Sequence, residues 1–404
     1  MQIPGKVLVE PRDYRSFCFR GEGRANFVIS ARHRLTGVRI VWRFAKARKS
    51  GLLTVKARSE LVNSYMERIV APFFDEQYLV GMNIRVHGTT ILTNPKRLTS
   101  LQMLDATQLP TTISDESHSS TITVEIKPKQ GFFQHHPNVN VAHCNNCILQ
   151  IEKSCGHSHF SEMYDFCPMD LFSGNYSRMH KAIHSLFLVP HRNLRIFIDG
   201  NQVHSDEKPL EEAVFSETLF PRNEATSEDL ISALCLALSG NQSKKKFRLR
   251  NSSVLGQILR AQKVDEIGIV QAHAIYDRMD HHTKTALLDK SSLTRAGLEA
   301  ILERKSSENE HLLQQLRRYF LAATMKDCSI MISLRLIQSC PSPRRDIIRL
   351  PNGRVFAFTI KIVDLDPKTA KNLINCHPRF MSGVKIIRLD QESAEHDRKF
   401  KPCV

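Results

Sequence analysis

The chain has 404 residues, and its 41% hydrophobic and 24% charged residues are typical of an ordinary globular protein. No apolar run is long enough to span a bilayer and no apolar segment follows the N-terminus, which disfavours a membrane or secreted protein. We therefore expect a cytoplasmic or nuclear protein whose ten cysteines are free thiols or metal ligands. The net charge of +16 favours polyanionic partners, which include nucleic acid, anionic membranes and phosphorylated small molecules.

The N-terminal part of the sequence is predicted to be mainly strands. Apolar patterns predict strands at 26–31, 38–46 and 76–86, and a helix at 56–71. Gly21 and Gly23 come just before the first strand, where glycine lets the backbone approach a phosphate closely. Residues 105–108 then predict a hinge between two parts of the chain.

The rest of the chain alternates between strands and helices, so the sequence predicts an α+β protein. Strands are predicted at 121–126, 193–198, 329–336 and 355–363. Helices are predicted at 227–239, 252–264, 267–280, 293–304 and 306–325. Residues 240–250 contain three consecutive lysines and predict a basic linker, with a nuclear localisation signal as the alternative interpretation.

Two lysines follow the strand predicted at 121–126. Pro128 lies between Lys127 and Lys129 and cannot continue a central strand. Both lysines are therefore expected at the end of a strand, where the binding sites of α/β proteins usually lie. Binding of phosphate is one interpretation, and solvated surface lysines are the other.

Three aspartates stand beside predicted strands. Asp327 lies between a helix and the strand at 329–336, and Asp364 and Asp366 follow the strand at 355–363 with a spacing that lets both face one ion. Phosphoryl transfer needs carboxylates that hold magnesium and a group that orients the attacking hydroxyl. Aspartates are also common in caps and turns, which is the alternative interpretation.

The established nucleotide-binding motifs are missing. The glycine pair is not followed by the Gly-Lys-Ser/Thr of a Walker loop, and the His-Arg-Asp and Asp-Phe-Gly triplets of protein kinases are absent. The residues alone thus predict a phosphate-handling protein, either a non-standard kinase or a non-catalytic protein that binds polyphosphates or RNA. Aromatic residues make up only 7%, which disfavours RNA binding, because RNA-binding sheets usually present aromatic side chains.

Cysteines and histidines gather between residues 143 and 159. The Cys-x2-Cys spacing of Cys144 and Cys147 fits zinc, and Cys155 and His157 follow at irregular spacing. A second Cys-x2-Cys pair is absent. The sequence leaves open whether these residues bind zinc or are packed thiols and surface imidazoles.

Five segments, in this order, resemble the inositol-pentakisphosphate 2-kinase family. They are 20–26 (RGEGRAN), 125–132 (EIKPKQGF), 166–175 (FCPMDLFSGN), 326–332 (KDCSIMI) and 363–366 (VDLD). The resemblance implies a two-lobed, kinase-like fold related to other inositol phosphate kinases. Residues 1–108 would form the smaller N-terminal lobe and residues 109–404 the larger C-terminal lobe.

The resemblance also implies the reaction. The γ-phosphoryl group of ATP, with Mg²⁺, would pass to the 2-hydroxyl of inositol 1,3,4,5,6-pentakisphosphate and give inositol hexakisphosphate (phytic acid). A kinase for a different inositol polyphosphate is the nearest alternative. We expect a monomer that needs neither a membrane nor nucleic acid.

Roles for individual residues follow from the resemblance. The residues expected to bind ATP are Gly21, Glu22, Gly23, Ala25, Asn26, Arg43, Asp105, Thr107, Glu125 and Met331. Those expected to bind the inositol phosphate are Arg48, Lys127, Lys129, Lys153, Asn175 and Lys368. Asp327 and Lys127 are expected to be catalytic, Asp327 as the group that orients or deprotonates the hydroxyl, while Asp364 and Asp366 would hold magnesium.

The sequence departs from the family pattern at several positions. Gln130 stands where cysteine is usual, a histidine is missing near Leu149, and Phe380 stands where a tyrosine is expected. The candidates for a substrate-recognising arginine in the N-terminal lobe are Arg85 and Arg97. Plant members carry a zinc cluster between the middle and C-terminal segments, but this chain has only Cys235 there, so the resemblance implies no zinc at that place.

Overall fold

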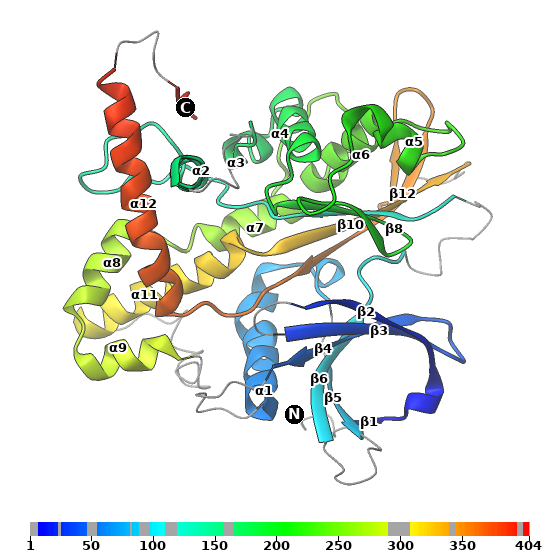
Figure 1. The fold of residues 1–404 in the computed structure, drawn as a ribbon, viewed down its shortest axis with the longest axis horizontal. Helices are drawn as coiled ribbons and strands as arrows, with labels where there is room; N and C mark the ends of the chain where they lie inside the picture. The colour runs from blue at the N-terminus through cyan, green and yellow to red at the C-terminus, as the bar shows by residue number, and fades with distance from the viewer. Residues whose placement is uncertain are drawn as a thin grey trace.

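The computed structural model describes residues 7–22, 26–46, 55–80, 83–88, 97–109, 119–156, 165–289, 308–338, 344–393 and 399–403. Within these residues the strands form two six-stranded sheets, and most of the helices surround the second sheet (Figure 1). Strands that precede residue 105 build the first sheet and strands that follow residue 121 build the second. The predicted α+β class is thereby confirmed.

The N-terminal sheet has the strand order β1-β5-β6-β4-β3-β2. Its strands are β1 (Val7–Val9), β2 (Tyr14–Glu22), β3 (Asn26–His33), β4 (Arg39–Ala45), β5 (Asn83–Gly88) and β6 (Arg97–Leu104). Helix α1 (Val55–Tyr65) contacts β4, β5 and β6 and continues into a π-helical turn (Met66–Val70) and a 3-10 turn (Ala71–Phe73). The strands predicted at 26–31 and 38–46 and the helix at 56–71 are confirmed.

The strand predicted at 76–86 is wrong in its first half. Residues Glu76–Tyr78 form a 3-10 turn, and β5 begins only at Asn83. Leu79 pairs with Ile362 of the second sheet, and Tyr78 and Leu79 pack against that sheet's core. The apolar residues at the start of this segment therefore pack against the second sheet and do not form a strand of the first.

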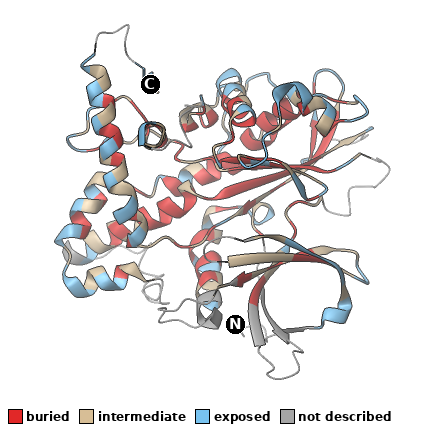
Figure 2. Ribbon diagram, viewed as in Figure 1, coloured by how far each residue is buried: buried red, intermediate tan, exposed pale blue. Residues whose placement is uncertain are grey.

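The C-terminal sheet has the order β11-β12-β10-β7-β8-β9, and all its neighbouring strands are antiparallel. Its strands are β7 (Ile122–Ile126), β8 (Leu194–Ile198), β9 (Asn201–His204), β10 (Ser329–Ile337), β11 (Ile347–Arg349) and β12 (Val355–Val363). β7 is buried at every position, and β10 is buried over its first six residues. These two strands form the centre of the molecule (Figure 2).

Two groups of helices lie on or beside this sheet. The first comprises α3 (Pro168–Leu171), α4 (Tyr176–Leu188), α5 (Phe215–Leu219), α6 (Ser227–Ser239) and α7 (Val254–Gln262). The second comprises α2 (Asn145–Gly156), α8 (Gly268–Arg278), α9 (His281–Leu288), α11 (Glu308–Lys326) and α12 (Ala370–Gln391). Residues of α2, α8, α11 and α12 share a separate apolar core, so the second group is a subdomain beside the sheet (Figure 1).

Most of the predicted helices are confirmed. α6, α7, α8 and α11 match the helices predicted at 227–239, 252–264, 267–280 and 306–325, and Thr226 and Asp229 form a capping box at the start of α6. The helix predicted at 293–304 lies outside the described residues. The sequence did not predict β2, α9 or α12. None of the described helices combines the length and apolarity needed to cross a membrane.

Candidate active site

The candidate site lies at one edge of the C-terminal sheet, where three strand ends meet. Ile126 at the end of β7 pairs with Ile330 near the start of β10, and Ser329 pairs with Val363 at the end of β12. Because these strands are antiparallel, the segments that follow β7, precede β10 and follow β12 emerge together. The predicted lysines and aspartates stand in those three segments.

Side chains from these segments contact one another directly. The ammonium of Lys129 lies 3.3 Å from Oδ1 of Asp327, and the ammonium of Lys368 lies 2.5 Å from Oδ2 of the same carboxylate. Lys127 lies 3.5 Å from Oδ2 of Asp364 and donates a 3.4 Å hydrogen bond to the backbone carbonyl of Asp327. Five of the predicted site residues therefore form one network of alternating charge.

The network shifts the pKa values of its members. Burial alone would raise the pKa of Asp327, but the ammonium groups of Lys129 and Lys368 outweigh it and hold this pKa well below its usual range. Burial also opposes the charged form of Lys127, yet the carboxylates of Asp364 and Asp327 raise its pKa. Lys129 behaves differently, because burial outweighs its carboxylate partner and lowers its pKa. The side chains of Asp327 and Asp364 remain 44% and 53% exposed, so a ligand can reach both.

The loop that carries Lys129 is held in a constrained conformation. Lys129 has a φ of 59°, in the left-handed region that non-glycine residues rarely occupy. Gln262, at the end of α7, donates a 2.7 Å hydrogen bond to the Lys129 carbonyl and accepts one of 2.8 Å from the backbone N–H of Gly131. Gly131 packs so closely on Phe172 that an added Cβ would overlap the ring. These contacts hold the loop in place from both sides.

An arginine connects the N-terminal sheet to this site. Arg43 on β4 donates two hydrogen bonds to the carboxylate of Asp366, of 2.9 Å and 2.5 Å. Asp366 follows β12, so this bidentate pair joins the two sheets next to the lysine–aspartate network. The structure brings the predicted phosphate-binding arginine and a predicted magnesium ligand together.

Glu125 and Met331, predicted to contact the nucleotide, are neighbours in the C-terminal sheet. They face each other in the register of β7 and β10, and both are buried. Asp105 and Thr107 stand between the sheets, where the Asp105 carboxylate accepts hydrogen bonds from the Thr107 backbone N–H and hydroxyl and from Arg20. The Asp105 side chain therefore stabilises the connection between the sheets.

The glycine-rich segment is described only in part. Gly21 lies near the end of β2, Glu22 ends that strand, and Asn26 begins β3 opposite Ala45 of β4. The predicted site residues that lie outside the described residues are Gly23, Ala25 and Arg48.

A basic wall formed by α2 and α12 stands beside Lys129. Burial and the charges of Lys129 and Arg379 lower the pKa of Lys153, which lies on α2. Arg379 on α12 forms a 2.5 Å ion pair with Glu152. The sequence did not predict Arg379 as a site residue. The one feature that could have indicated it is its position as a basic residue directly after Pro378, and helix α12 itself was not predicted.

Asn175 has a different environment. Its side-chain oxygen accepts a hydrogen bond from the backbone N–H of Arg178 and so caps α4. The structure therefore assigns Asn175 a helix-capping contact, while its predicted role toward the substrate stays a prediction.

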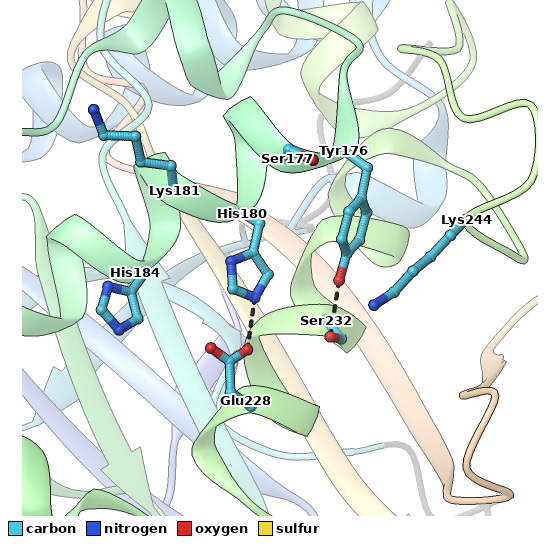
Figure 3. A pocket seen from close by; sticks show the side chains of 8 residues that line it. All are labelled: Tyr176, Ser177, His180, Lys181, His184, Glu228, Ser232 and Lys244. Carbon is cyan, nitrogen blue, oxygen red and sulfur yellow. Dashed lines mark hydrogen bonds and ion pairs between the residues drawn. The ribbon is translucent and has the colours of Figure 1, made fainter.

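A separate hollow of about 410 Å³ lies on the face of α4 and α6 (Figure 3). His180 contacts Glu228 at 2.7 Å, the hydroxyls of Tyr176 and Ser232 lie 2.9 Å apart, and Lys244 stands over the Tyr176 ring. None of the residues predicted for the site lines this hollow. We therefore place the candidate active site at the sheet edge.

The site combines cations that can hold phosphates with carboxylates that can hold a divalent ion. Phosphoryl transfer needs both, so the fold and the site fit a kinase. A sequence model of the inositol-pentakisphosphate 2-kinase family matches residues 19–377, and the chain belongs to that family.

Relatives of known name support this assignment. The inositol-pentakisphosphate 2-kinase of Arabidopsis thaliana is 25% identical to the chain over 91% of this chain and 92% of its own length. The enzyme of the same name from Danio rerio is 25% identical over 65% of this chain and 66% of its own length. The one from Oryza sativa subsp. indica is 30% identical over 64% and 58%.

Proposed function

We propose that the protein transfers the γ-phosphoryl group of ATP to the 2-hydroxyl of inositol 1,3,4,5,6-pentakisphosphate and forms inositol hexakisphosphate. The observation that carries this proposal is the contact of Asp327 with Lys129 and Lys368 at the edge of the C-terminal sheet. It places one reachable carboxylate among cations that suit a heavily phosphorylated substrate. Membership of the family supports the choice of substrate.

Asp327 acts on the attacking hydroxyl. Because its pKa lies well below the usual range, the carboxylate is ionised at neutral pH and is a weak base. Its main contribution is to accept a hydrogen bond from the hydroxyl and point the oxygen at the γ-phosphorus. A loose transition state requires little proton removal before the new bond forms, so a weak base is sufficient.

Asp364 and Asp366 are the residues that would hold a magnesium ion. Their carboxylates, with the Ser329 hydroxyl 3.4 Å from Asp364, offer the oxygen ligands that Mg²⁺ prefers. When bound, the ion would neutralise charge on the β- and γ-phosphates. Lys127, which lies between Asp364 and the backbone of Asp327, would hold the transferred group.

Lys129, Lys153 and Lys368 line the side where the inositol phosphate would bind. In the structure two of these lysines contact Asp327, and phosphate groups of the substrate would take over part of those contacts. Arg379 adds a further cation to this wall. A substrate with five phosphates needs cations on several sides. The loop after β7, helix α2 and the segment that precedes α12 each supply one of these lysines.

The direct test is an assay of the purified chain with Mg-ATP and inositol 1,3,4,5,6-pentakisphosphate, in which inositol hexakisphosphate is followed by anion-exchange chromatography. We expect Asp327→Ala to lower kcat by about 10²-fold or more, because the hydroxyl loses its orienting group. Asp327→Asn, which keeps one acceptor oxygen, should lose less. Glu207→Ala changes an exposed acidic residue of the same lobe and should leave the rate unchanged.

Two outcomes would overturn the proposal. Product formation by Asp327→Ala at the wild-type rate would remove Asp327 from the mechanism. Conversion of a different inositol polyphosphate in preference to the pentakisphosphate, by folded wild-type protein, would overturn the choice of substrate.

A further inference from the structure

Three arginines stand side by side at one end of the N-terminal sheet. Arg15 on β2 is the direct partner of Arg32 on β3, and Arg32 is the direct partner of Arg39 on β4. Residues directly opposite one another in a sheet point to the same face, with their Cβ atoms about 4.5–5.5 Å apart. Because neighbouring strands lie about 4.8 Å apart, the three residues form an arginine row that extends over roughly 10 Å.

The arginine row has little negative charge to balance it. Asp105 stands beside Arg39, since its backbone N–H donates a 3.2 Å hydrogen bond to the Arg39 carbonyl and its Oδ2 lies 4.0 Å from the Arg39 Nε. Both carboxylate oxygens are already used, because Oδ1 accepts from Thr107 and Oδ2 accepts a 3.0 Å hydrogen bond from Arg20. Within the described part of the chain, the other two members of the row form no ion pair.

A fourth arginine adds positive charge to the same face. The Arg20 guanidinium donates a 2.8 Å hydrogen bond to the hydroxyl of Ser30, which stands two residues before Arg32 and therefore on the same face of β3. Burial and the charge of Arg20 lower the pKa of Arg39, and the carboxylate of Asp105 offsets them only in part. The charged groups around Arg39 are therefore mainly cations.

An arrangement of this kind favours the binding of a polyanion. Like charges directly opposite each other destabilise a sheet, so a bound anion would remove a repulsion that the empty protein carries. Guanidinium groups bind phosphate oxygens through two parallel hydrogen bonds. A row of roughly 10 Å is longer than a single phosphate group and suits a ligand with two or more.

The arginine row is accessible and lies apart from the candidate active site. Arg15 is exposed, Arg32 is half-buried and the Arg39 side chain is 21% exposed. Gly200, in the turn between β8 and β9, packs so closely on the Arg39 guanidinium that an added Cβ would lie 3.1 Å from it, so this turn closes one side of the row. Arg43 lies four residues further along β4, a distance of about 13 Å along the strand.

We propose that Arg15, Arg32 and Arg39 bind a soluble small molecule with two or more phosphate groups, at a site separate from the candidate active site. The guanidinium groups donate hydrogen bonds to the phosphate oxygens, and the ligand takes the place of the missing carboxylates. The turn at Gly200 favours a small ligand over a flat lipid surface. The proposal rests on the register of β2, β3 and β4 and does not depend on the proposed kinase reaction.

Chemical modification of individual arginines tests the proposal directly. Inorganic tripolyphosphate is the probe, and modification of each arginine by phenylglyoxal is measured by peptide mass spectrometry on the full-length protein. We expect tripolyphosphate to protect Arg15 and Arg32, also while a non-hydrolysable ATP analogue and Mg²⁺ are present at saturating concentration. Arg222, an exposed arginine in the segment before α6, is the control and should react equally with and without the probe.

A variant at the centre of the row supplies the second measurement. Arg32→Gln should raise the tripolyphosphate concentration needed to protect Arg15 by about 10-fold or more, because a charged donor is lost. The same variant should raise the midpoint of thermal unfolding without ligand, because Arg32 no longer repels its two neighbours. Its kinase activity should stay at the wild-type level. Arg222→Gln is the matched control and should change neither protection nor unfolding.

Three outcomes would overturn the proposal. In the first, tripolyphosphate does not protect Arg15 and Arg32 in the wild type. In the second, the ATP analogue abolishes the protection, which would assign the row to the nucleotide site. In the third, vesicles with phosphorylated inositol lipids protect the row and free tripolyphosphate does not. A protein that binds tripolyphosphate at the row but has no kinase activity would contradict only the proposed function.

Discussion

Lys127 and Lys129 stand two residues apart, and their surroundings shift their pKa values in opposite directions. The lowered pKa of Lys129 means that its ammonium loses its proton at a lower pH than an ordinary lysine, while Lys127 keeps its proton to a higher pH. A neutral amine no longer attracts a phosphate. We therefore expect kcat/KM for the inositol substrate to fall on the alkaline side before the usual lysine pKa of about 10.4 is reached, and a pH profile would measure this.

The Lys129→Arg variant isolates this effect, because a guanidinium stays charged throughout the profile. We expect the alkaline fall of kcat/KM to move to higher pH in this variant. A fall at the same pH as in the wild type would exclude Lys129 as the group that causes it.

On the acid side of the profile, the lowered pKa of Asp327 keeps its carboxylate ionised below the usual value of about 3.9. Protonation of this group should therefore cause no loss of kcat/KM between about pH 5 and 7.

Gly131 tests how tightly the lysine loop is packed. Gly131→Ala would make the new methyl group overlap the ring of Phe172, which is itself buried. We expect a loss of about 1–3 kcal/mol in the free energy of unfolding, measured by chemical denaturation. Gly156→Ala is the matched control, because an added Cβ there meets no atom within 4 Å. Equal losses of stability in the two variants would show that the contact with Phe172 does not restrict the size of the side chain at position 131.

The sequence predicted residues that the structure brings together at one place, but not how they pair. Lys127, Asp327 and Asp364 were recognisable because each stands directly beside an apolar strand. Their contacts depend on the strand order β7-β10-β12, which periodicity does not encode. The pairing of Arg43 with Asp366 joins residues more than three hundred positions apart, and no local pattern could have indicated it.

At the scale of whole elements, α7 positions the loop of Lys129 through its last residue. Gln262→Leu removes the hydrogen bonds from the side chain to the Lys129 carbonyl and from the Gly131 N–H. We expect KM for the inositol substrate to rise while KM for ATP changes little, because the strained Lys129 conformation loses its support. Steady-state kinetics with each substrate varied in turn would measure the difference.

Gln257 provides the matched control for this prediction. It is also a buried glutamine of α7, and it makes hydrogen bonds of 2.8 Å and 2.7 Å with Asp75 and one of 3.1 Å with the Ser252 carbonyl. Gln257→Leu should cost about 1–3 kcal/mol of stability, as Gln262→Leu does, without the selective change in KM. If both variants changed KM equally, the effect would be a general result of destabilising α7.

The elements that the sequence predicted are those with strong periodicity or clear caps, such as β7, β10 and α6. Helix α12 escaped prediction because Pro378 lies inside it, and proline normally ends or kinks a helix. Its register is set instead by packing, since Gly383 approaches α2 so closely that an added Cβ would lie 2.8 Å from the Ile148 side chain. Tertiary packing of α12 on α2 here overrides the helix-breaking preference of Pro378.

At the scale of the whole molecule, two arginines of the N-terminal sheet contact the C-terminal sheet. Arg20 donates to the Asp105 carboxylate at 3.0 Å and to the carbonyl of Gly200, in the turn between β8 and β9. Arg43 reaches Asp366 at the opposite sheet edge. The first contact lies on the connection between the sheets, whereas the second involves Arg43, which is predicted to bind ATP.

With the proposed roles of Arg43 in binding the nucleotide and of Asp366 in binding magnesium, we expect the binding of these two ligands to be interdependent. A phosphate that draws Arg43 away would leave Asp366 without its cation, and a magnesium ion that takes Asp366 would leave Arg43 without its anion. The binding of one ligand therefore lowers the free-energy cost of binding the other. This coupling must be reciprocal. We expect calorimetry to show much weaker binding of metal-free ATP than of Mg-ATP. In Asp366→Asn the difference between these two affinities should be smaller. The fraction of the protein with bound nucleotide would then depend on the concentration of Mg-ATP and not on the total concentration of adenine nucleotides.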